Sequence, residues 1–496
     1  MTELADAATP AAAPARTILG QPLGIATLFL TEMWERFTYY GVQSLLILFM
    51  VAPAAQGGLG LGDKASASIY GLYVGSTYLL GLLGGWIADR LAGAQRAVIA
   101  GGTLIALGNT LLALGTTAVF FLGLFVIAMG VGLLKPNVSA LVAALYPEGG
   151  ARRDAGFSIF YMGINTGGFL GPVLVPLAAT AFGWRFGFGL TALGMALGVV
   201  QFLRTRRLLG GAGLAVAPEQ RASWTPIVVL GGLIAAGVLL ALSGAVRIDP
   251  ARLASRASWM FSLLAVAYFV YLLFFAGLSG AERRRVLVMV ALFIASLTFW
   301  AGYFQQGASF NLFAARYTDM HILGWNAPPG MLQAANSLFV IILAGAFAAL
   351  WLALGRRERD PPVSAKFGVA LLLLGLGFLV MYFAAQRVRG GQLVLPTWLL
   401  CTYFLHVCGE MCLSPVGLSN MSKLVPPRFV GQAMGMWFLS LALGGTLAGQ
   451  LTGEYDASHL ESLPALFLKI FWYGAIAGVV MLLLTPPVKR LMAGVR

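Results

Sequence analysis

The stretch TEMWERFTYYG, residues Thr31–Gly41, places three charged side chains inside an apolar run that extends from about residue 22 to residue 51. A run of this length can cross a bilayer as a helix. Charged side chains are costly in hydrocarbon, so within a membrane they pair with one another or face a watery cavity. The stretch is therefore either a functional site in a membrane protein or not a spanning segment. Helical spacing places its polar side chains on one broad face and the shoulder of that face: Glu32, Glu35, Arg36, Tyr39 and Tyr40.

The composition of the whole chain decides between these readings. Of its 496 residues, 59% are hydrophobic and only 10% are charged, whereas soluble domains carry about 25% charged residues. The fold class expected is therefore an all-α membrane protein. The net charge of +14 comes mostly from basic residues between apolar runs. That placement favours orientation in the membrane over nucleic-acid binding, for which no basic domain is present.

Fourteen apolar segments are long enough to span a bilayer. Six precede residue 207 and six follow residue 285, which predicts two six-helix bundles, at 22–207 and 285–496. The two segments between them, in a linker at 208–284, are interpreted as an insertion. The approximate limits of the fourteen segments are 22–51, 66–89, 96–116, 118–146, 157–181, 186–205, 224–244, 258–278, 285–315, 328–354, 366–386, 393–420, 429–452 and 465–488.

The basic residues between these segments predict the orientation. With the N-terminus inside, about 21 Lys and Arg residues fall in inside loops and about nine outside, so both termini are expected in the cytoplasm. Residues 1–21 are rich in Ala, Pro and Thr and lack the pattern of a signal peptide, which indicates a disordered cytoplasmic tail. The three cysteines, Cys401, Cys408 and Cys412, lie in one apolar run and are expected to be reduced.

Three further polar positions stand out among the apolar segments. Lys135, in GVGLLKPNVSALVAALY, lies well over a turn from the nearest charged loop, which favours an inward-facing cation over one that snorkels to an interface. Asn165 follows Tyr161 by one helical turn and is either an interhelical hydrogen-bonding residue or part of the same site. In Gly84–Arg96, GGWIADRLAGAQR, the charges are either ordinary interfacial residues or a lock between two helices.

These motifs together resemble one known family. TEMWERFTYYG, LLKPNVSALV and FSIFYMGIN, with GEMCLSPVGLSNMSKLVPP at Gly409–Pro427 and GMWFLSLALGG at Gly435–Gly445, resemble the signatures of the proton-dependent oligopeptide transporters, a family of the major facilitator superfamily. Gly84–Arg96 resembles the loop motif of that superfamily. The resemblance runs from about residue 22 to the end, and fourteen spans look like the bacterial members. It implies a major facilitator fold in a bacterial cytoplasmic membrane.

The resemblance also implies roles for individual residues. The substrates would be di- and tripeptides, carried with protons by alternating access of the two bundles. The residues implied in proton coupling are Glu32, Glu35, Arg36 and Lys135, the last as the cation that pairs with the acids of the first span. The residues implied in peptide binding are Arg36, Tyr39, Tyr40, Tyr78, Lys135, Asn165, Asn336, Glu410 and Trp437.

Physical chemistry agrees with these roles. A zwitterionic peptide offers a carboxylate and an ammonium at a nearly fixed separation. Arg36 can grip a carboxylate bidentately, and Lys135 adds a point charge. Glu410 is the obvious partner for the ammonium, although a local pair with His406, four residues earlier, is an alternative.

The seventh core span departs from the family pattern. Within Thr298–Arg316 the family usually has a glutamate in F-E-Q, where this chain has Phe304, Gln305 and Gln306. The residues implied in gating are Asp89, Arg90 and Gln305. Because Gln305 cannot titrate, we expect Glu32 and Glu35, modulated by Lys135, to carry the coupling. The alternative is a weakly coupled peptide facilitator.

Other classes of protein fit less well. No phosphate-binding loop indicates an ATP-driven pump. A metal enzyme built on His406, Cys408, Glu410 and Cys412 is disfavoured because residues 406 and 408 diverge around a helix. A channel, a sensor, or a relative that carries nitrate or another small metabolite is an alternative, although Glu410 would oppose an anion. We expect a monomer in contact with membrane lipid, without a cofactor or metal.

Overall fold

The computed structural model describes residues 17–18, 20–148, 150–214, 216, 221–243, 249–322, 324–454 and 462–492. Most of the predicted tail at 1–21 therefore lies outside the described residues. Its last part forms a short antiparallel pair, β1 (Thr17–Ile18) with β2 (Gln21–Pro22), in which Thr17 lies opposite Pro22.

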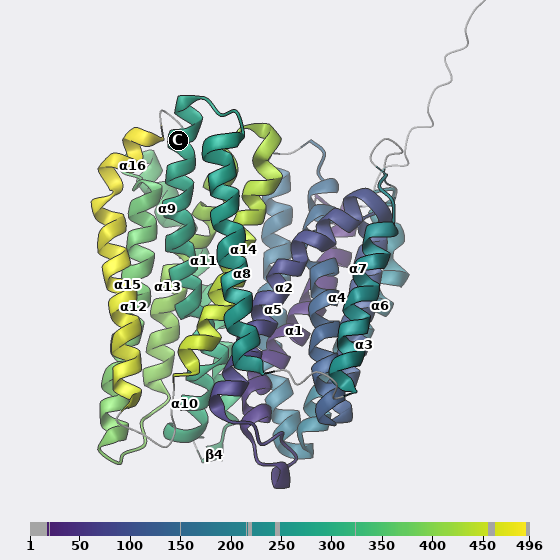
Figure 1. Cartoon of the computed structure of the whole chain (residues 1–496), viewed down its shortest axis with the longest axis vertical. Coiled ribbons are helices and arrows are strands. Elements are labelled where there is room, and N and C mark those ends of the chain that lie inside the picture. Colours follow the sequence, from purple (N-terminus) through teal and green to yellow (C-terminus); the bar gives the residue numbers. More distant parts are fainter. Residues whose placement is uncertain are drawn as a thin grey trace, which may run out of the picture.

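Six long helices form the first bundle, on one side of the molecule (Figure 1). Proline is tolerated inside α4 and α5 because both helices lie within a packed membrane bundle. A π-helical turn, η2 (Ala88–Ala92), extends α2, and the short helices η1 (Ala54–Gln56) and η3 (Arg206–Leu209) lie in the connections. The long helices are α1 (Gly24–Val51), α2 (Asp63–Ile87), α3 (Ala94–Leu114), α4 (Thr117–Ala144), α5 (Gly150–Phe182) and α6 (Trp184–Thr205).

The second bundle has the same number of spans, the first of which is broken. α9 (Gly280–Tyr303) passes through η6 (Phe304–Gly307) into α10 (Ser309–Tyr317), and Ala308 between them departs from helical geometry. The strands β3 (His321–Ile322) and β4 (Trp325–Asn326) pair in the following loop. The remaining elements are η7 (Pro329–Gln333), α11 (Ala334–Arg356), α12 (Val363–Arg389), α13 (Thr397–Lys423), η8 (Pro427–Phe429), α14 (Val430–Thr452), α15 (Ser462–Leu483) and α16 (Thr485–Leu491).

Two more helices lie between the bundles in sequence: α7 (Thr225–Leu242) and α8 (Pro250–Val270), the second extended by the π-helical turn η5 (Tyr271–Phe275). α8 packs against α2 of the first bundle and α14 of the second. Gln450 of α14 donates a hydrogen bond of 2.8 Å to the Ser258 hydroxyl of α8. The insertion is therefore joined to both bundles through one of its two helices.

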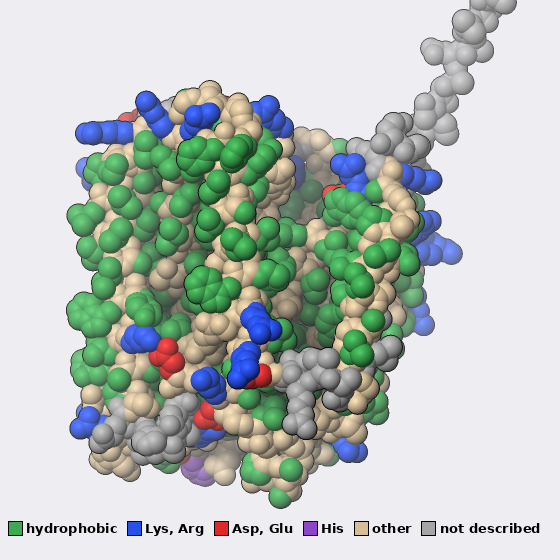
Figure 2. All heavy atoms as spheres, viewed as in Figure 1, with side chains coloured by type: hydrophobic (Ala, Val, Ile, Leu, Met, Phe, Trp, Pro, Cys, Tyr) green, Lys and Arg blue, Asp and Glu red, His purple; other side chains and the backbone are tan. Residues whose placement is uncertain are grey.

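The helices agree with the segments expected from sequence. Twelve helices in the described ranges are long and apolar enough to cross a membrane. α1, which has 28 residues and carries three buried charges, and α7, which has 18 residues, coincide with the other two expected segments. Hydrophobic side chains cover the flanks of the molecule, and Lys and Arg side chains gather near the end that carries α16 (Figure 2).

The two bundles meet closely along α2 and α14. Glycines face one another there: a Cβ on Gly71 would lie 2.9 Å from the Cα of Gly449, and one on Gly75 would lie 2.7 Å from the Ala442 oxygen. Such a crossing needs residues without side chains, because backbone approaches backbone.

Polar contacts close the end of the molecule that carries α10. The guanidinium of Arg316 on α10 binds the Asp63 carboxylate on α2 bidentately, at 2.6 and 2.8 Å. Asn311 of α10 donates a hydrogen bond of 2.9 Å to the Ser44 carbonyl of α1. We call these two contacts the α10-end seal, since each joins one bundle to the other.

Candidate functional site

A cavity of about 240 Å³ lies between the two bundles. Helices α1, α2, α4 and α5 form one wall, and η6, η7, α9, α11, α13 and α14 form the other. The polar side chains that line it come from elements far apart in the sequence: Glu32, Arg36, Tyr39, Tyr40, Gln43, Tyr78, Lys135, Tyr161, Asn165, Tyr303, Gln306, Gln333, Asn336, Ser337, Glu410 and Ser414.

The structure brings together the residues expected to bind peptide. All nine of them line this one cavity: Arg36, Tyr39, Tyr40, Tyr78, Lys135, Asn165, Asn336, Glu410 and Trp437. Of the two acids expected to handle protons, Glu32 lines the cavity, and Glu35 is 1% exposed beside it. The assignment of a role to each residue stays a prediction.

The first-bundle wall is organised by the Arg36 guanidinium. Its Nε donates to the Glu35 carboxylate and lies 3.3 Å from an oxygen of Glu32. The guanidinium carbon also lies 4.9 Å from the ring centre of Tyr39, a cation–π distance. One oxygen of each glutamate and the Nη2 of Arg36 are buried without a partner among the described residues. Unused hydrogen-bonding capacity therefore remains around this ion pair.

Lys135 occupies a different position from the one expected. Its ammonium lies 4.3 Å from the ring centre of Tyr78, and no ion pair within 4.0 Å joins it to Glu32 or Glu35 in the described part of the chain. The expected direct pairing is not formed in this conformation, in which the Arg36 Nε is the cation within ion-pair distance of one oxygen of each carboxylate. Lys135 is therefore a second cation of the same wall, held by an aromatic face.

The opposite wall presents one acid in a hydrogen-bonded group. The Tyr303 hydroxyl donates to the Glu410 carboxylate, and the Asn336 amide donates to that hydroxyl at 2.9 Å. His406 takes no part, because its Nε2 contacts the Leu374 carbonyl at 3.2 Å. The local His406–Glu410 pair considered from sequence is therefore not formed, and Glu410 faces the cavity.

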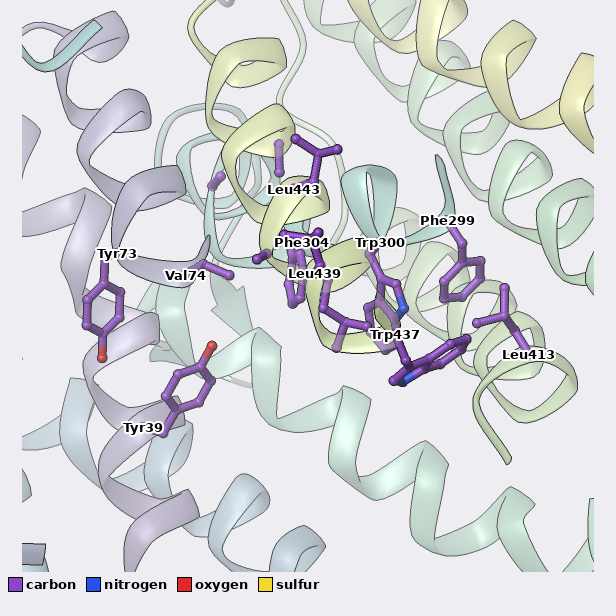
Figure 3. Packing of buried hydrophobic residues seen from close by; sticks show 14 of the residues in the cluster. Tyr39, Tyr73, Val74, Phe299, Trp300, Phe304, Leu413, Trp437, Leu439 and Leu443 are labelled. Carbon is purple, nitrogen blue, oxygen red and sulfur yellow. The ribbon is translucent and has the colours of Figure 1, made fainter. Parts of the chain in front are cut away.

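Aromatic and aliphatic side chains complete the second-bundle wall. Figure 3 shows Trp300, Phe304, Trp437 and Leu439 close together on this side, with Tyr39 on the other. The rings of Trp300 and Phe304 stack with centres 5.4 Å apart. Such surfaces accept apolar groups of varied shape, while the few polar groups fix orientation.

Sequence reasoning missed part of this site. Tyr303, Trp300 and Gln306 all lie in the recognised seventh core span, but comparison with the family pattern singled out only Gln305 in that span. These three residues follow one another at intervals of three, which places them on one face of a helix, and this spacing could have predicted that they share a site. Tyr161 was noticed only as a neighbour of Asn165, yet it also lines the cavity.

The residues expected in gating lie outside the cavity lining. Gln305 is fully buried within the second bundle: its amide donates to the Ala448 carbonyl at 3.0 Å, and its oxygen accepts from Ser309 at 2.6 Å and Thr452 at 2.7 Å. Asp89 and Arg90 are exposed on η2, and no ion pair of theirs is formed in the described ranges. The Arg90 carbonyl instead accepts a bond of 3.0 Å from the Ala222 amide.

The described residues contain no group of three or more His, Cys, Asp and Glu side chains placed to hold a metal ion. The three cysteines are free.

Comparison with known proteins gives consistent matches. The model of the POT family matches residues 95–466. "Peptide transporter YePEPT" of Yersinia enterocolitica is 38% identical over 501 residues, covering 96% of each chain. "Di-/tripeptide transporter" of Lactococcus lactis subsp. cremoris is 31% identical and covers 97% of this chain and 98% of its own. A solved glutamate-to-glutamine mutant of the peptide transporter POT, in complex with alafosfalin, superposes with a TM-score of 0.89 at 40% identity, covering 97% and 98% of the two chains.

Proposed function

This chain belongs to the POT family, and we propose that it carries di- and tripeptides into the cell together with protons. The observation that carries the proposal is the division of charge across the cavity. Arg36 and Lys135 lie on one wall, and Glu410 lies on the other. A zwitterionic peptide that lies across the cavity would meet cations at its carboxylate and an acid at its ammonium. Recognition would then fall on groups that every short peptide shares.

The same charges suggest how the two bundles are coupled. A peptide bound at both ends bridges the bundles, because Arg36 belongs to one and Glu410 to the other. Binding therefore favours states in which the walls approach each other, and the empty carrier is freer to rock. We infer that alternating access follows, with opening of the α10-end seal on the outside and opening at the α16 end on the inside.

We infer that the protons act on the acids of α1. Protonation of Glu35 or Glu32 would remove a partner of Arg36 and free the guanidinium for the peptide carboxylate. Peptide and proton would then bind cooperatively, since binding of either one makes the free energy of binding the other more favourable. The basic residues near the α16 end favour a cytoplasmic location for that end in a bacterial cytoplasmic membrane. The rocking of two bundles around one cavity needs a single chain, so we propose a monomer with no cofactor.

The test is uptake of labelled dialanine into proteoliposomes with an imposed inward proton gradient. We expect peptide to accumulate above the external concentration, and di- and tripeptides to compete while free amino acids and nitrate do not. Accumulation should collapse when a protonophore removes the gradient. Uptake that only equilibrates would support the weakly coupled facilitator that Gln305 suggests, and competition by nitrate would support the anion carrier.

A further inference from the structure

One face of α2 carries a line of polar side chains that the cavity does not use, all buried except the partly exposed Asp63 at one end. They recur at intervals of three and four residues, which places them on one side of the helix. None of them lines the cavity between the bundles. We call this line the relay stripe, and its members are Asp63, Ser66, Tyr70, Tyr73 and Thr77.

The relay stripe runs from the α10 end of the molecule to the charged cluster on α1. At one end, the Asp63 side chain is 16% exposed and pairs with Arg316. In the middle, Gln43 of α1 donates a hydrogen bond of 2.6 Å to the Tyr70 hydroxyl, which itself donates to the Phe304 carbonyl at 3.2 Å. Further along, the ring of Tyr73 stacks on that of Tyr39 of α1 at 6.4 Å (Figure 3). These pairings have the register expected of two antiparallel helices, and they lead toward Arg36 and Glu35.

Several polar atoms along this line are buried without a hydrogen-bond partner. They are the hydroxyls of Ser66, Tyr73 and Tyr39 and one carboxylate oxygen of Glu35. Their residues are at most 4% exposed. Buried polar atoms are rarely left unsatisfied, and ordered water commonly completes them. These four atoms lie on either side of Tyr70, whose own hydroxyl is hydrogen-bonded, and they point to ligands that the protein itself does not supply.

We propose that the relay stripe, with Tyr39 and bound water, conducts protons from the outer surface to Glu35. The path lies outside the peptide cavity as far as Tyr73 and reaches the cavity wall at Tyr39, which lines the cavity, and the inference rests on the proposed proton coupling. A proton enters at the Asp63 carboxylate when Arg316 releases it. The Tyr70 hydroxyl first turns from the Phe304 carbonyl to which it donates. Each hydroxyl then accepts a proton on its oxygen and gives up its own to the next group, through water where the gap requires it. The last transfer protonates the Glu35 carboxylate, so one proton moves inward and the hydroxyls are left reversed in orientation.

The charged groups at the two ends fit this direction of flow. Asp63 faces Arg316 at the outer end, and the inner end opens on Glu35, Glu32 and Arg36, with Lys135 on the same wall of the cavity. Between these ends the line is neutral, and protons move along it by exchange between hydroxyl groups rather than by resting on a charged side chain.

The test compares Tyr73→Phe with Tyr268→Phe in proteoliposomes. Tyr268 on α8 also buries an unpartnered hydroxyl, so the control removes the same atom from a place outside the path. Two rates are measured for each variant: accumulation of dialanine driven by a proton gradient, and exchange of labelled for unlabelled dialanine at equal pH, which needs no net proton movement. We expect Tyr73→Phe to lower the driven rate at least about tenfold, equivalent to about 1.4 kcal/mol of barrier, and to keep the exchange rate. Tyr268→Phe should change neither rate.

Ser66→Ala is the second variant, because loss of one small oxygen leaves the packing intact. It should lower the driven rate in the same direction and spare exchange. Wild-type driven rates in both Ser66→Ala and Tyr73→Phe would overturn the relay. Equal loss of driven uptake and exchange in both variants would also overturn it, since that pattern reports a structural role. A wild-type protein that exchanges dialanine but never accumulates it would overturn the proton coupling itself, and the relay with it.

Discussion

The donor and acceptor of the Gln305 amide each meet complementary hydrogen-bonding groups in the buried site around it. Its NH2 group faces the Ala448 carbonyl, and its oxygen faces the hydroxyls of Ser309 and Thr452. An ionised glutamate would satisfy the two hydroxyls, but it would turn a carboxylate oxygen toward the Ala448 carbonyl. An amide satisfies all three partners at once. The site therefore suits a neutral side chain, and the chain has one that is neutral at every pH.

The first prediction is that Gln305→Glu destabilises the protein. Loss of the bond to the Ala448 carbonyl in a buried site should cost about 1–3 kcal/mol. The measurement is the free energy or midpoint of unfolding of the purified protein in detergent at neutral pH. Gln392→Glu, on an exposed loop, is the control and should leave the midpoint unchanged. An equal or higher midpoint for Gln305→Glu would contradict the proposed match.

Glu410 supports a second prediction at the residue scale. If its carboxylate binds the peptide ammonium, Glu410→Gln removes a charge-assisted bond worth about 1.5–3 kcal/mol. The KM for dialanine should then rise by about 10- to 150-fold. N-acetyl-dialanine has no ammonium, so its weaker uptake should be unaffected by the substitution. A parallel loss for both compounds would show that Glu410 acts on the fold or the cycle and not on the ammonium.

At the scale of the element, the α2–α14 crossing depends on glycine. A Cβ on Gly71 would meet backbone atoms of Gly445 and Gly449 at 2.9 Å, and backbone cannot turn aside as a flexible side chain can. Forcing the helices apart should cost about 1–3 kcal/mol. This close approach also fixes the spacing of the two bundles just beside the cavity.

The third prediction is that Gly71→Ala lowers both the unfolding midpoint and the rate of peptide exchange. The control is Gly345→Ala in α11, where a Cβ would meet nothing within 4 Å. Because alanine is also the better helix former, the control should be neutral or slightly stabilising. If the two variants unfold alike, the crossing tolerates a side chain and the packing argument is wrong.

The elements were largely predictable from sequence, because length and apolarity suffice to locate spanning helices. The break between α9 and α10 was not, since 285–315 was interpreted as one apolar segment, although Gln305, Gln306 and Gly307 immediately precede Ala308, where helical geometry is lost. Among the site residues, Arg36 was found because charge in an apolar helix is conspicuous, and Glu410 was found through the family resemblance. Tyr303 was missed because a tyrosine is ordinary there, and only the fold brings its hydroxyl to Glu410.

Lys135 shows the same limit. The sequence indicates that it needs a partner, but it does not show that Arg36 is the cation paired with both acids, or that the Lys135 ammonium lies against the Tyr78 ring. Which of two cations pairs with an acid depends on the distances between their side chains, and these distances are known only from the folded structure.

For the whole molecule, the cavity and the α10-end seal together define one state of a transport cycle. The seal joins α1 and α2 of one bundle to α10 of the other. A carrier that rocks must break these contacts once per cycle, so they need to be strong enough to close the end and weak enough to open. A pair of partly exposed charges meets both conditions, because solvent screens much of its energy.

The last prediction concerns this balance. Arg316→Gln removes the bidentate pair with Asp63, which at this exposure should be worth about 1 kcal/mol. The ratio of molecules open at the α10 end to molecules closed there should rise by about fivefold. Spin labels at Gln56→Cys and Gln392→Cys, in a chain with its three cysteines replaced by serine, would report the distance between the bundles at this end. A longer distance should gain population in Arg316→Gln, and saturating dialanine should shift the populations again.

The control is Arg152→Gln, which breaks an exposed pair with Glu148 within the first bundle. This substitution should leave the distance distribution unchanged, because no contact between the bundles is lost. If Arg316→Gln also leaves the distribution unchanged, the Asp63–Arg316 pair does not hold the end closed, and closure must come from the glycine crossing and the Asn311 contact. If the closed population rises instead, the pair opposes closure, and the assignment of the seal to the closed state is wrong.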